Sequence, residues 1–412
     1  MRVICHEVKD AKFAEYSKYE EQKLYVNIEE ITAYCLEGVT GYELEFQWAK
    51  PGDEVRVVHI TDTVAPVYKE EGSTFQGILE GEHRCGKGKT VRLEGIAVMQ
   101  SFKYPGIQEG IVDMAGEGSK YSVFSQMINL VMVVSLAKED ITKSQIANDL
   151  NKMNLRCAEF LGRLAQRISG GIVEEVSTES FVEGLLNVGY AYFIQAQGPL
   201  RNVHIYGEDC TKMEPRIMAP EEIIDGALIS GNYIIACQKN PTYFHQKNPV
   251  IEELLRRHGK ELNFKCVILS TEGSLLETKK SNCDKIAHIA KEQGLDGIIV
   301  TQEGGGHADV DLMMTIDACQ KVGIATVIQT NEIAGAEGAL PSLVASSEYA
   351  DAIITNGNND EVIVLDEMKY SIGGNTILAG KYDALQSFET SLGILYTSTN
   401  QLGANSMKTK TY

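Results

Sequence analysis

From about residue 220 onward, short apolar runs alternate with longer stretches of helical periodicity. The runs have the β-branched composition of buried strands. Strands that alternate with helices of this length pair in parallel, with helices on both faces of the sheet. The predicted strands are residues 264–270, 297–300, 324–329, 352–355 and 362–364, and the predicted helices are residues 275–293, 308–322 and 341–349. This part of the chain is therefore expected to form an α/β fold around a doubly wound, mostly parallel sheet.

The earlier part of the chain has a pattern that favours a β-rich α+β region. Strand composition is found at residues 25–28, 55–60 and 90–98, and residues 127–137 form either a core strand or a buried helix. Residues 140–168 predict a long helix, since apolar side chains recur on one face and Asp140 or Thr142 can cap its start.

A second helical stretch near residues 180–186 leads into predicted strands at 190–194 and 203–207, which form either a hairpin or a short crossover. The polar, proline-containing residues 207–220 mark the expected boundary between two domains. These are an N-terminal β-rich region, residues 1–210, and a C-terminal α/β domain, residues 211–412. The tail from residue 404 is expected to fray.

The loops that follow the predicted strands are rich in glycine, asparagine and glutamate, at residues 271–273, 303–307, 331–338 and 356–359. Right-handed crossovers place such loops at one edge of the sheet, where open α/β sheets bind their ligands. Loops of this kind lead into helix N-termini that can hold a carboxylate. A small zwitterion would suit them.

Two kinds of site residue follow from this arrangement. Glu303 and Glu332 are the acid/base candidates, because a strand end holds a carboxylate rigidly beside partly excluded water. The expected substrate-binding residues are Gly304, Gly305, Gly306, His307 and Asn331. No metal is expected at His307, Asp309 and Asp311, since Asp309 points away from the helix face that the other two share.

A thiol stands where another apolar run, residues 233–236, meets a segment with two Asn-Pro steps. A residue before proline is disfavoured in the α region, so each step holds the chain extended or turning. Taken alone, Cys237 beside isoleucine and alanine is most simply a small buried side chain. If residues 233–236 belong to the parallel sheet, Cys237 lies at the same edge as the four loops.

Composition narrows the classes of function. The 412 residues carry a formal net charge of -19, which argues against a nucleic acid or an acidic membrane as partner. The nine cysteines are scattered, without zinc spacing or a C-x-x-C pair, which favours reduced thiols in the cytoplasm. No secretory signal is recognised, and the most apolar run, residues 127–137, is too short to span a bilayer.

Three segments carry a resemblance to a known family: I-A-C-Q-K-N-P-T-Y-F-H-Q-K-N-P, G-P-L-R-N-V-H-I-Y-G and E-G-G-G-H-A-D-V-D-L-M-M. They resemble the proprotein of component B of glycine, sarcosine and betaine reductases. The resemblance runs through most of residues 190–365. It implies that the backbone breaks between Ala236 and Cys237, giving fragments of 236 and 176 residues, and that Cys237 becomes a pyruvoyl group.

The resemblance also implies an activity and its partners. A pyruvoyl ketone can bind a glycine-type amine and draw electrons from its C–N bond for reductive cleavage, with no metal or nucleotide. The implied partners are a selenoprotein subunit of component B and a selenoprotein carrier, in a hetero-oligomer. Asn240, Thr242 and His245 are the polar neighbours proposed to polarise the scissile carbonyl and move protons.

Two other functions stay open. Cys237 with His245 or a distant histidine could be the nucleophile pair of a hydrolase or amidotransferase, or the chain could be an α/β ligand-binding subunit that never cleaves. A second dipeptide able to break itself, Asn282–Cys283, lies within the predicted helix 275–293, where a regular backbone has little strain to release.

Overall fold

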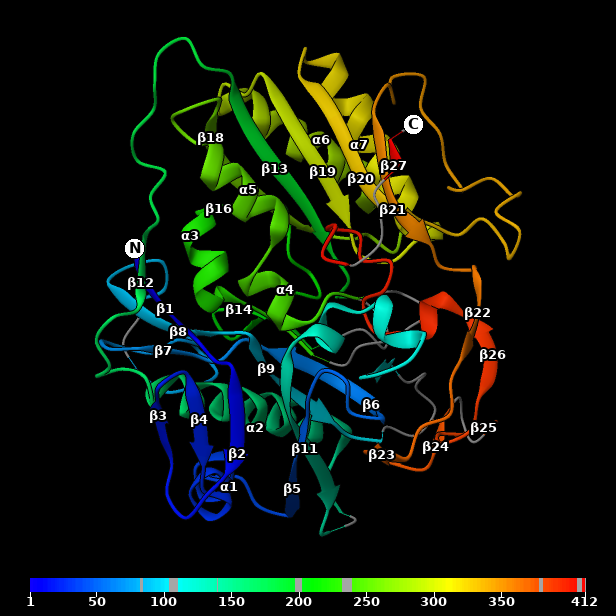
Figure 1. Ribbon diagram of the computed structural model, residues 1–412. Coiled ribbons are helices and arrows are strands. Elements are labelled where there is room, and N and C mark those ends of the chain that lie inside the picture. Colours follow the sequence, from blue (N-terminus) through cyan, green and yellow to red (C-terminus); the bar gives the residue numbers. More distant parts are fainter. Residues whose placement is uncertain are drawn as a thin grey trace.

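The computed structural model describes residues 1–81, 84–103, 110–138, 140–196, 202–231, 239–377, 381–405 and 410–411. Its largest sheet has the strand order β16-β18-β13-β19-β20-β21-β27 (Figure 1). The inner strands are parallel, and β16 and β27 are antiparallel edge strands. The bounds are β13 Asn187–Ile194, β16 Arg216–Met218, β18 Asn263–Thr271, β19 Gly297–Gln302, β20 Ala325–Glu332, β21 Ile353–Asn358 and β27 Lys410–Thr411.

Helices cover both faces of this sheet. On one face α6 (Leu276–Glu292) and α7 (Asp309–Lys321) pack against Ala191 and Phe193 of β13. On the other face, α4 (Thr242–Gln246) and α5 (Pro249–Arg257) share a core with Tyr190 and Tyr192. Successive side chains of a strand point to opposite faces, and a strand buried on both faces needs an apolar run. The predicted doubly wound α/β sheet is confirmed.

The second Asn-Pro step shows how sequence sets one of these helices. Asn248 has an extended backbone, with φ -71° and ψ 112°, and its side chain accepts hydrogen bonds from the backbone N–H groups of Val250 and Ile251. Pro249 occupies the first helical position, where its missing N–H costs nothing. The step therefore starts α5 directly.

The N-terminal part is built from sheets with the orders β12-β1-β8-β7 and β10-β6-β9-β11-β5, and a smaller sheet β2-β4-β3. The predicted long helix is α2, and Thr142 caps it by accepting a hydrogen bond from Gln145 N. Residues 127–137 form a strand, β11, and residues 90–98 are divided between β8 and β9, which lie in different sheets. The bounds are β1 Arg2–Glu7, β2 Asp10–Phe13, β3 Lys18–Glu20, β4 Lys23–Val26, α1 Ile28–Cys35, β5 Tyr42–Ala49, β6 Val55–Val64, β7 Val67–Lys69, β8 Lys89–Glu94, β9 Ile96–Ser101, β10 Gly110–Asp113, β11 Ile128–Leu136, α2 Lys143–Arg163 and β12 Ile172–Glu175.

Short elements complete the chain: β14 Val203–Ile205, β15 Glu208–Asp209, α3 Pro220–Glu222, β17 Leu228–Ser230, β22 Val362–Leu365, β23 Tyr370–Ile372, β24 Thr376–Ile377, β25 Tyr382–Asp383 and β26 Phe388–Ser391. Strand β13 precedes the predicted boundary at residues 210/211 but lies inside the large sheet, and β23 pairs with β6 of the N-terminal part. Pairings thus cross that boundary, and the division into two domains stays a prediction. No helix in the described ranges is long and apolar enough to cross a membrane.

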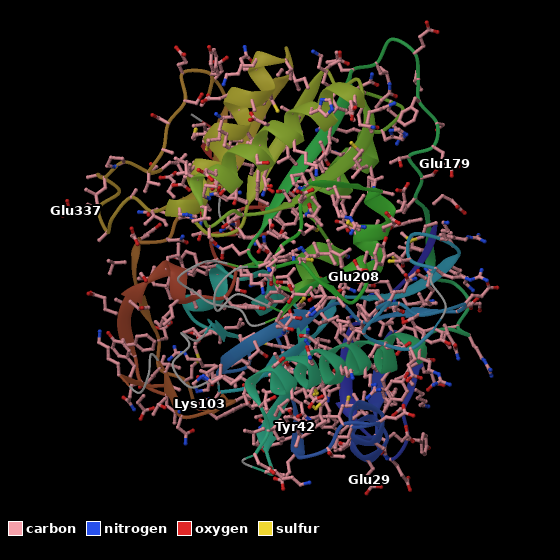
Figure 2. The ribbon with its side chains drawn as sticks, turned by 180° about the vertical axis from the view of Figure 1, so that it is seen from behind. Glu29, Tyr42, Lys103, Glu179, Glu208 and Glu337 are labelled. Carbon is pink, nitrogen blue, oxygen red and sulfur yellow. The ribbon has the colours of Figure 1, made fainter. Side chains whose placement is uncertain are left out.

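Two predicted helices are wrong. Near residues 180–186, Gly184 has φ +85°, and the side chain of Asn263 bonds both backbone groups of Val182, so the chain makes a turn there instead of a helix. Residues 341–349 are irregular and leave Val344 exposed. Their serines bond groups outside the segment, since Ser342 Oγ donates to Glu332 and Ser347 Oγ donates to Asp317, which competes with a helix. Glu179, one residue before the first segment, and Glu337, four residues before the second, lie on opposite sides of the molecule in Figure 2.

Two smaller expectations also fail. Strands β13 and β14 lie in different sheets, so they form neither a hairpin nor a crossover within one sheet. The tail does not fray throughout, because β27 pairs with β21. Asn282 and Cys283 do lie inside α6, and both are buried, as expected for a dipeptide in a regular helix.

Candidate active site

The carboxyl ends of the parallel strands meet at one edge of the sheet, as the arrowheads of β13 and β19 show in Figure 1. Two glutamates flank the end of the central strand β13. Glu303 N donates to Phe193 O (3.0 Å), and Glu272 N donates to Ile194 O (3.2 Å). The prediction that the four loops share an edge is confirmed.

Glu303 is a well-connected carboxylate at this edge. Its Oε2 accepts a hydrogen bond from Gln195 N (2.7 Å), and its Oε1 accepts one from Asn240 N (3.0 Å) and a longer one from the Tyr192 hydroxyl (3.4 Å). The side chain is fully buried, and burial raises the pKa of Glu303 to about 7. A buried group with this pKa can both accept and donate a proton near neutral pH.

His245 of α4 lies beside this carboxylate. Its Nδ1 is 3.3 Å from the Tyr192 hydroxyl, and its Nε2 is 3.8 Å from Glu303 Oε1. Burial, with a smaller effect from the Lys239 charge, lowers the pKa of His245 to about 3, so the imidazole is neutral at pH 7. Nε2 is buried and makes no hydrogen bond within the part of the chain that the structure describes. It can therefore serve a ligand as donor or acceptor, according to its tautomer.

Asn240 joins these groups into one cluster. Its Nδ2 donates to the Tyr192 hydroxyl (2.8 Å), and its Oδ1 accepts from Asn400 Nδ2. Asn240, His245 and Glu303 were all predicted as site residues, and the structure brings them together. Together with Tyr192 they form the buried polar cluster, the name used below for these four residues. Their catalytic roles stay predictions.

The other predicted residues lie outside the buried polar cluster. Thr242 bonds Asp62 and Ser230. Glu332, one strand further along, accepts from Thr355 Oγ1 (2.5 Å) and Ser342 Oγ (3.4 Å). Cys237 and Ala236, with the predicted strand 233–236, lie outside the described residues.

Residues Gly304 to Gly306 follow Glu303 directly, but they are not part of the buried polar cluster. Gly304 O accepts from Gln302 Nε2 and from Gln401 Nε2, both at 3.3 Å, and Asn331 Nδ2 donates to Thr399 Oγ1 (3.5 Å). Gly304 and Gly306 have positive φ, and a Cβ on Gly305 would lie 2.6 Å from Ile333 Cδ1. The positive φ of Gly304 and Gly306 favours glycine at these two positions of the turn. His307 is exposed, Asp309 accepts from Val344 N, and Asp311 pairs with Lys279.

The described residues on either side of residues 232–238 are tied together. Lys239 Nζ donates to Gly231 O (2.5 Å), and Ser230 N donates to Thr242 Oγ1 (2.9 Å). Ser230, Gly231, Lys239 and Thr242 are all buried. The segment that contains the predicted scissile bond therefore begins and ends at fixed points.

A groove of about 710 Å³ lies at the carboxyl end of β18. It is lined by the end of β18, by the start of α6 and by residues 211–214, and Glu272 stands in its wall. Glu272 is hydrogen-bonded to the Gln195 side chain, and the Gln195 N–H bonds Glu303. Gln195 thus links the wall of the groove to the buried polar cluster through hydrogen bonds.

Comparisons with known proteins place the whole chain. The family model described as glycine/sarcosine/betaine reductase component B subunits matches residues 1–410. The chain belongs to this family. It is 37% identical to "glycine reductase complex component B subunits alpha and beta" of Peptoclostridium acidaminophilum and 36% identical to the protein of that name from Acetoanaerobium sticklandii, in each case over 98% of both chains. Identity with "sarcosine reductase complex component B subunit alpha" of Peptoclostridium acidaminophilum is 33%, also over 98% of both. No solved structure matches the chain.

As a component B chain of a reductase complex, the protein works with other subunits of that complex. Sequence reasoning missed several residues at its candidate site. Tyr192 was assigned to a strand only, although a buried tyrosine hydroxyl usually needs a partner. Asn400 and Gln401 belong to a polar run, residues 397–401, that is fully buried against the sheet edge. The signal was present in that run, T-S-T-N-Q, but polar runs are usually solvent-exposed.

The raised pKa of Glu303 predicts a pH-dependent stability. Between its ordinary value of 4.5 and about 7, the folded chain keeps a proton that the unfolded chain has lost. The free energy of unfolding therefore falls as pH rises through this window. Replacing Glu303 with glutamine removes this contribution, so the stability of the variant relative to its parent should rise from pH 4.5 to pH 7. Urea unfolding of both chains, each carrying Cys237→Ala to prevent cleavage, measures the difference, and a constant difference would contradict it.

Proposed function

We propose that this chain is the precursor of the pyruvoyl-containing subunits of component B, and that it cleaves its own backbone between Ala236 and Cys237. One observation carries the proposal. The backbone N–H of Asn240, three residues after Cys237, bonds the carboxylate of Glu303 directly. Chain connectivity keeps any residue three positions away within about 11 Å of Asn240. The predicted scissile bond thus lies within a few residues, along the chain, of a member of the buried polar cluster.

The names of the relatives add independent support. Two sequences that align with 98% of this chain each carry the name of two subunits, alpha and beta. One backbone break in a chain of this length would supply two subunits from one precursor. Cleavage before residue 237 would give fragments of 236 and 176 residues.

The proposed cleavage balances without an external oxidant. The Cys237 sulfur attacks the Ala236 carbonyl, the C–N bond breaks, and the thiol proton passes to the released nitrogen, leaving a thioester. Loss of the Cα proton of residue 237 then expels the sulfur as a thiocarboxylate and leaves a dehydroalanine. Its imine tautomer takes up water and releases ammonia, which gives the keto group. A second water converts the thiocarboxylate to a carboxylate and hydrogen sulfide.

The residues of the buried polar cluster fit these demands. Glu303, with a pKa of about 7, can take up the thiol or Cα proton and return it. His245 Nε2, buried and without a hydrogen bond in the described chain, offers a neutral partner to a carbonyl oxygen or a water. Once formed, the keto group would bind the substrate amine and draw electrons from its C–N bond.

The same cluster suits a small zwitterion of the glycine type. The Lys239 charge lowers the pKa of His245 and partly offsets the rise that burial causes in the pKa of Glu303, so a positive charge lies near both buried groups. The substrate carboxylate would pair with Lys239, and its amine would face Glu303. We further propose a selenoprotein subunit of component B and a selenoprotein carrier as partners, and the cytoplasm as the location.

Intact-mass spectrometry of the purified chain tests the cleavage. We expect two fragments divided before residue 237, the second blocked to Edman degradation by its keto terminus. Cys237→Ala should give one chain of 412 residues, because alanine has no leaving group on Cβ. A single unmodified wild-type chain that reacts with a thiol-directed inhibitor would favour a cysteine hydrolase instead. A single inert chain would favour a ligand-binding subunit.

A further inference from the structure

The hydroxyl of Thr242 is the meeting point of three segments. Thr242 Oγ1 accepts a hydrogen bond from Ser230 N (2.9 Å), and it lies 2.8 Å from Asp62 Oδ2 and 2.9 Å from Ser230 O, to one of which it donates. Thr242 N also donates to Asp62 Oδ1 (2.9 Å). All three residues are buried. A carboxylate of the N-terminal region thus fixes the backbone on both sides of residues 232–238.

The local structure of β6 aims Asp62 at this point. The register between β6 and β9 shifts between Ile60 and Asp62, so one extra residue stands in β6. A bulge of this kind re-aims the side chains beside it and is often found next to active sites. Without the extra residue, Asp62 would lie opposite Met99 of β9 instead of Gln100. The bulge is therefore part of how Asp62 reaches Thr242.

The other end of α4 is held by the same part of the chain. Gln246 Oε1 accepts from Ala65 N (2.9 Å), and Gln246 Nε2 donates to Ala65 O (3.5 Å). The helix between these two anchors carries His245 of the buried polar cluster. The N-terminal region therefore fixes both ends of α4, and with them the position of the His245 imidazole.

We propose that Asp62 and Thr242 are positioning residues for the backbone cleavage. They hold Ser230 and α4 at a fixed separation, and so fix the described backbone on both sides of the predicted scissile bond. The inference rests on the proposed function. It assigns a role in maturation to the first part of the chain, which the sequence left without one.

A pair of substitutions isolates the hydroxyl. Thr242→Val keeps the shape of the side chain and removes its hydrogen bonds, whereas Thr242→Ser keeps the hydroxyl. The uncleaved chain, recovered from inclusion bodies in urea, is diluted to pH 7, and its conversion to fragments is followed by intact mass. Misplaced groups slow chemistry steeply, so Thr242→Val should lower the rate about 10- to 100-fold, and Thr242→Ser should stay close to the wild type.

A matched control shows how much the loss of any buried threonine hydroxyl affects stability and cleavage. Thr315 of α7 is also fully buried, and its Oγ1 donates to Asp311 O (2.7 Å), away from residues 230–242. Thr315→Val should lower the melting temperature but leave the cleavage rate near that of the wild type. If Thr242→Val slows cleavage no more than Thr315→Val does, the positioning role is wrong.

Two further chains keep the outcomes separable. Asp62→Asn preserves an acceptor for Thr242 N and removes the carboxylate, so it serves if Thr242→Val does not fold, and it should also slow cleavage. A folded Asp62→Asn chain that is cleaved at the wild-type rate would overturn the proposal. If the wild type itself is not cleaved and is recovered as one intact chain, as Cys237→Ala should be, the proposed function would be overturned instead.

Discussion

Replacing Glu303 with glutamine is expected to slow backbone cleavage by about two to four orders of magnitude. Glutamine has nearly the same shape but cannot take up or return a proton. Its amide also cannot accept hydrogen bonds at both positions now used by Gln195 N and Asn240 N. The rate of fragment formation after dilution from urea, followed by intact mass between pH 5 and pH 9, gives the effect. The wild-type profile should change slope near the pKa of Glu303, about 7, and the variant should lack that feature.

Glu221→Gln supplies the matched control for this prediction. Glu221 is also buried, on α3, where it accepts hydrogen bonds from Thr178 N (2.6 Å) and Thr178 Oγ1 (3.0 Å), outside the buried polar cluster. The same chemical change there should leave the cleavage rate close to that of the wild type. Glu332→Gln tests the second carboxylate predicted from sequence. A larger loss with Glu332→Gln than with Glu303→Gln would move the proton-transfer role to Glu332.

The two products of cleavage are expected to remain one folded unit. Strand β13 would belong to the first fragment, yet it lies between β18 and β19 of the second and pairs with both along its length. Strand β23 of the second fragment pairs in turn with β6 of the first. Phe124 packs against Phe244 and Tyr396, with ring centroids 5.5 Å apart in both pairs. The fragments cannot separate without breaking the central sheet and its core.

Size-exclusion chromatography tests this directly. Under native conditions both fragments should elute together in one peak, and they should resolve only in denaturant. A chain of residues 237–412 made alone would expose the edges of β18 and β19 where β13 belongs, so it should aggregate. Coexpression with residues 1–236 should restore a soluble complex. Elution of the two fragments in separate native peaks would contradict the interleaved sheet.

The sequence was sufficient to predict the strands of the parallel sheet and the edge at which they end, because hydrophobic periodicity and chain direction determine both. The apolar runs that became β18, β19, β20 and β21 were found because strands buried on both faces need such runs. Their common edge followed from the handedness of crossovers. Glu303, Asn240 and His245 were named from their places next to strand ends and the thiol, and the structure puts them in one cluster.

Contacts between residues far apart in the chain could not be predicted in this way. Nothing in the run that became β13 states that it lies between two strands that follow it by more than 60 residues. In the sequence, Tyr192 looks like an ordinary core residue of a strand. Only the structure shows that its hydroxyl bridges Asn240 and His245. The role of Asp62 could not be predicted for the same reason, since its contact with Thr242 spans 180 residues and depends on a local bulge.

The place of residues 397–401 has a consequence for the order of events during synthesis. Asn400 holds Asn240 although it follows that residue by 160 positions, and Gln401 holds the loop at Gly304. Domains fold from the N-terminus as the ribosome releases them. A nascent chain that has not yet been extended past residue 401 lacks these two side-chain amides, so the contacts around the buried polar cluster are incomplete. Self-processing would then wait until translation has passed this point, so a growing chain would not be cut as soon as Cys237 leaves the ribosome.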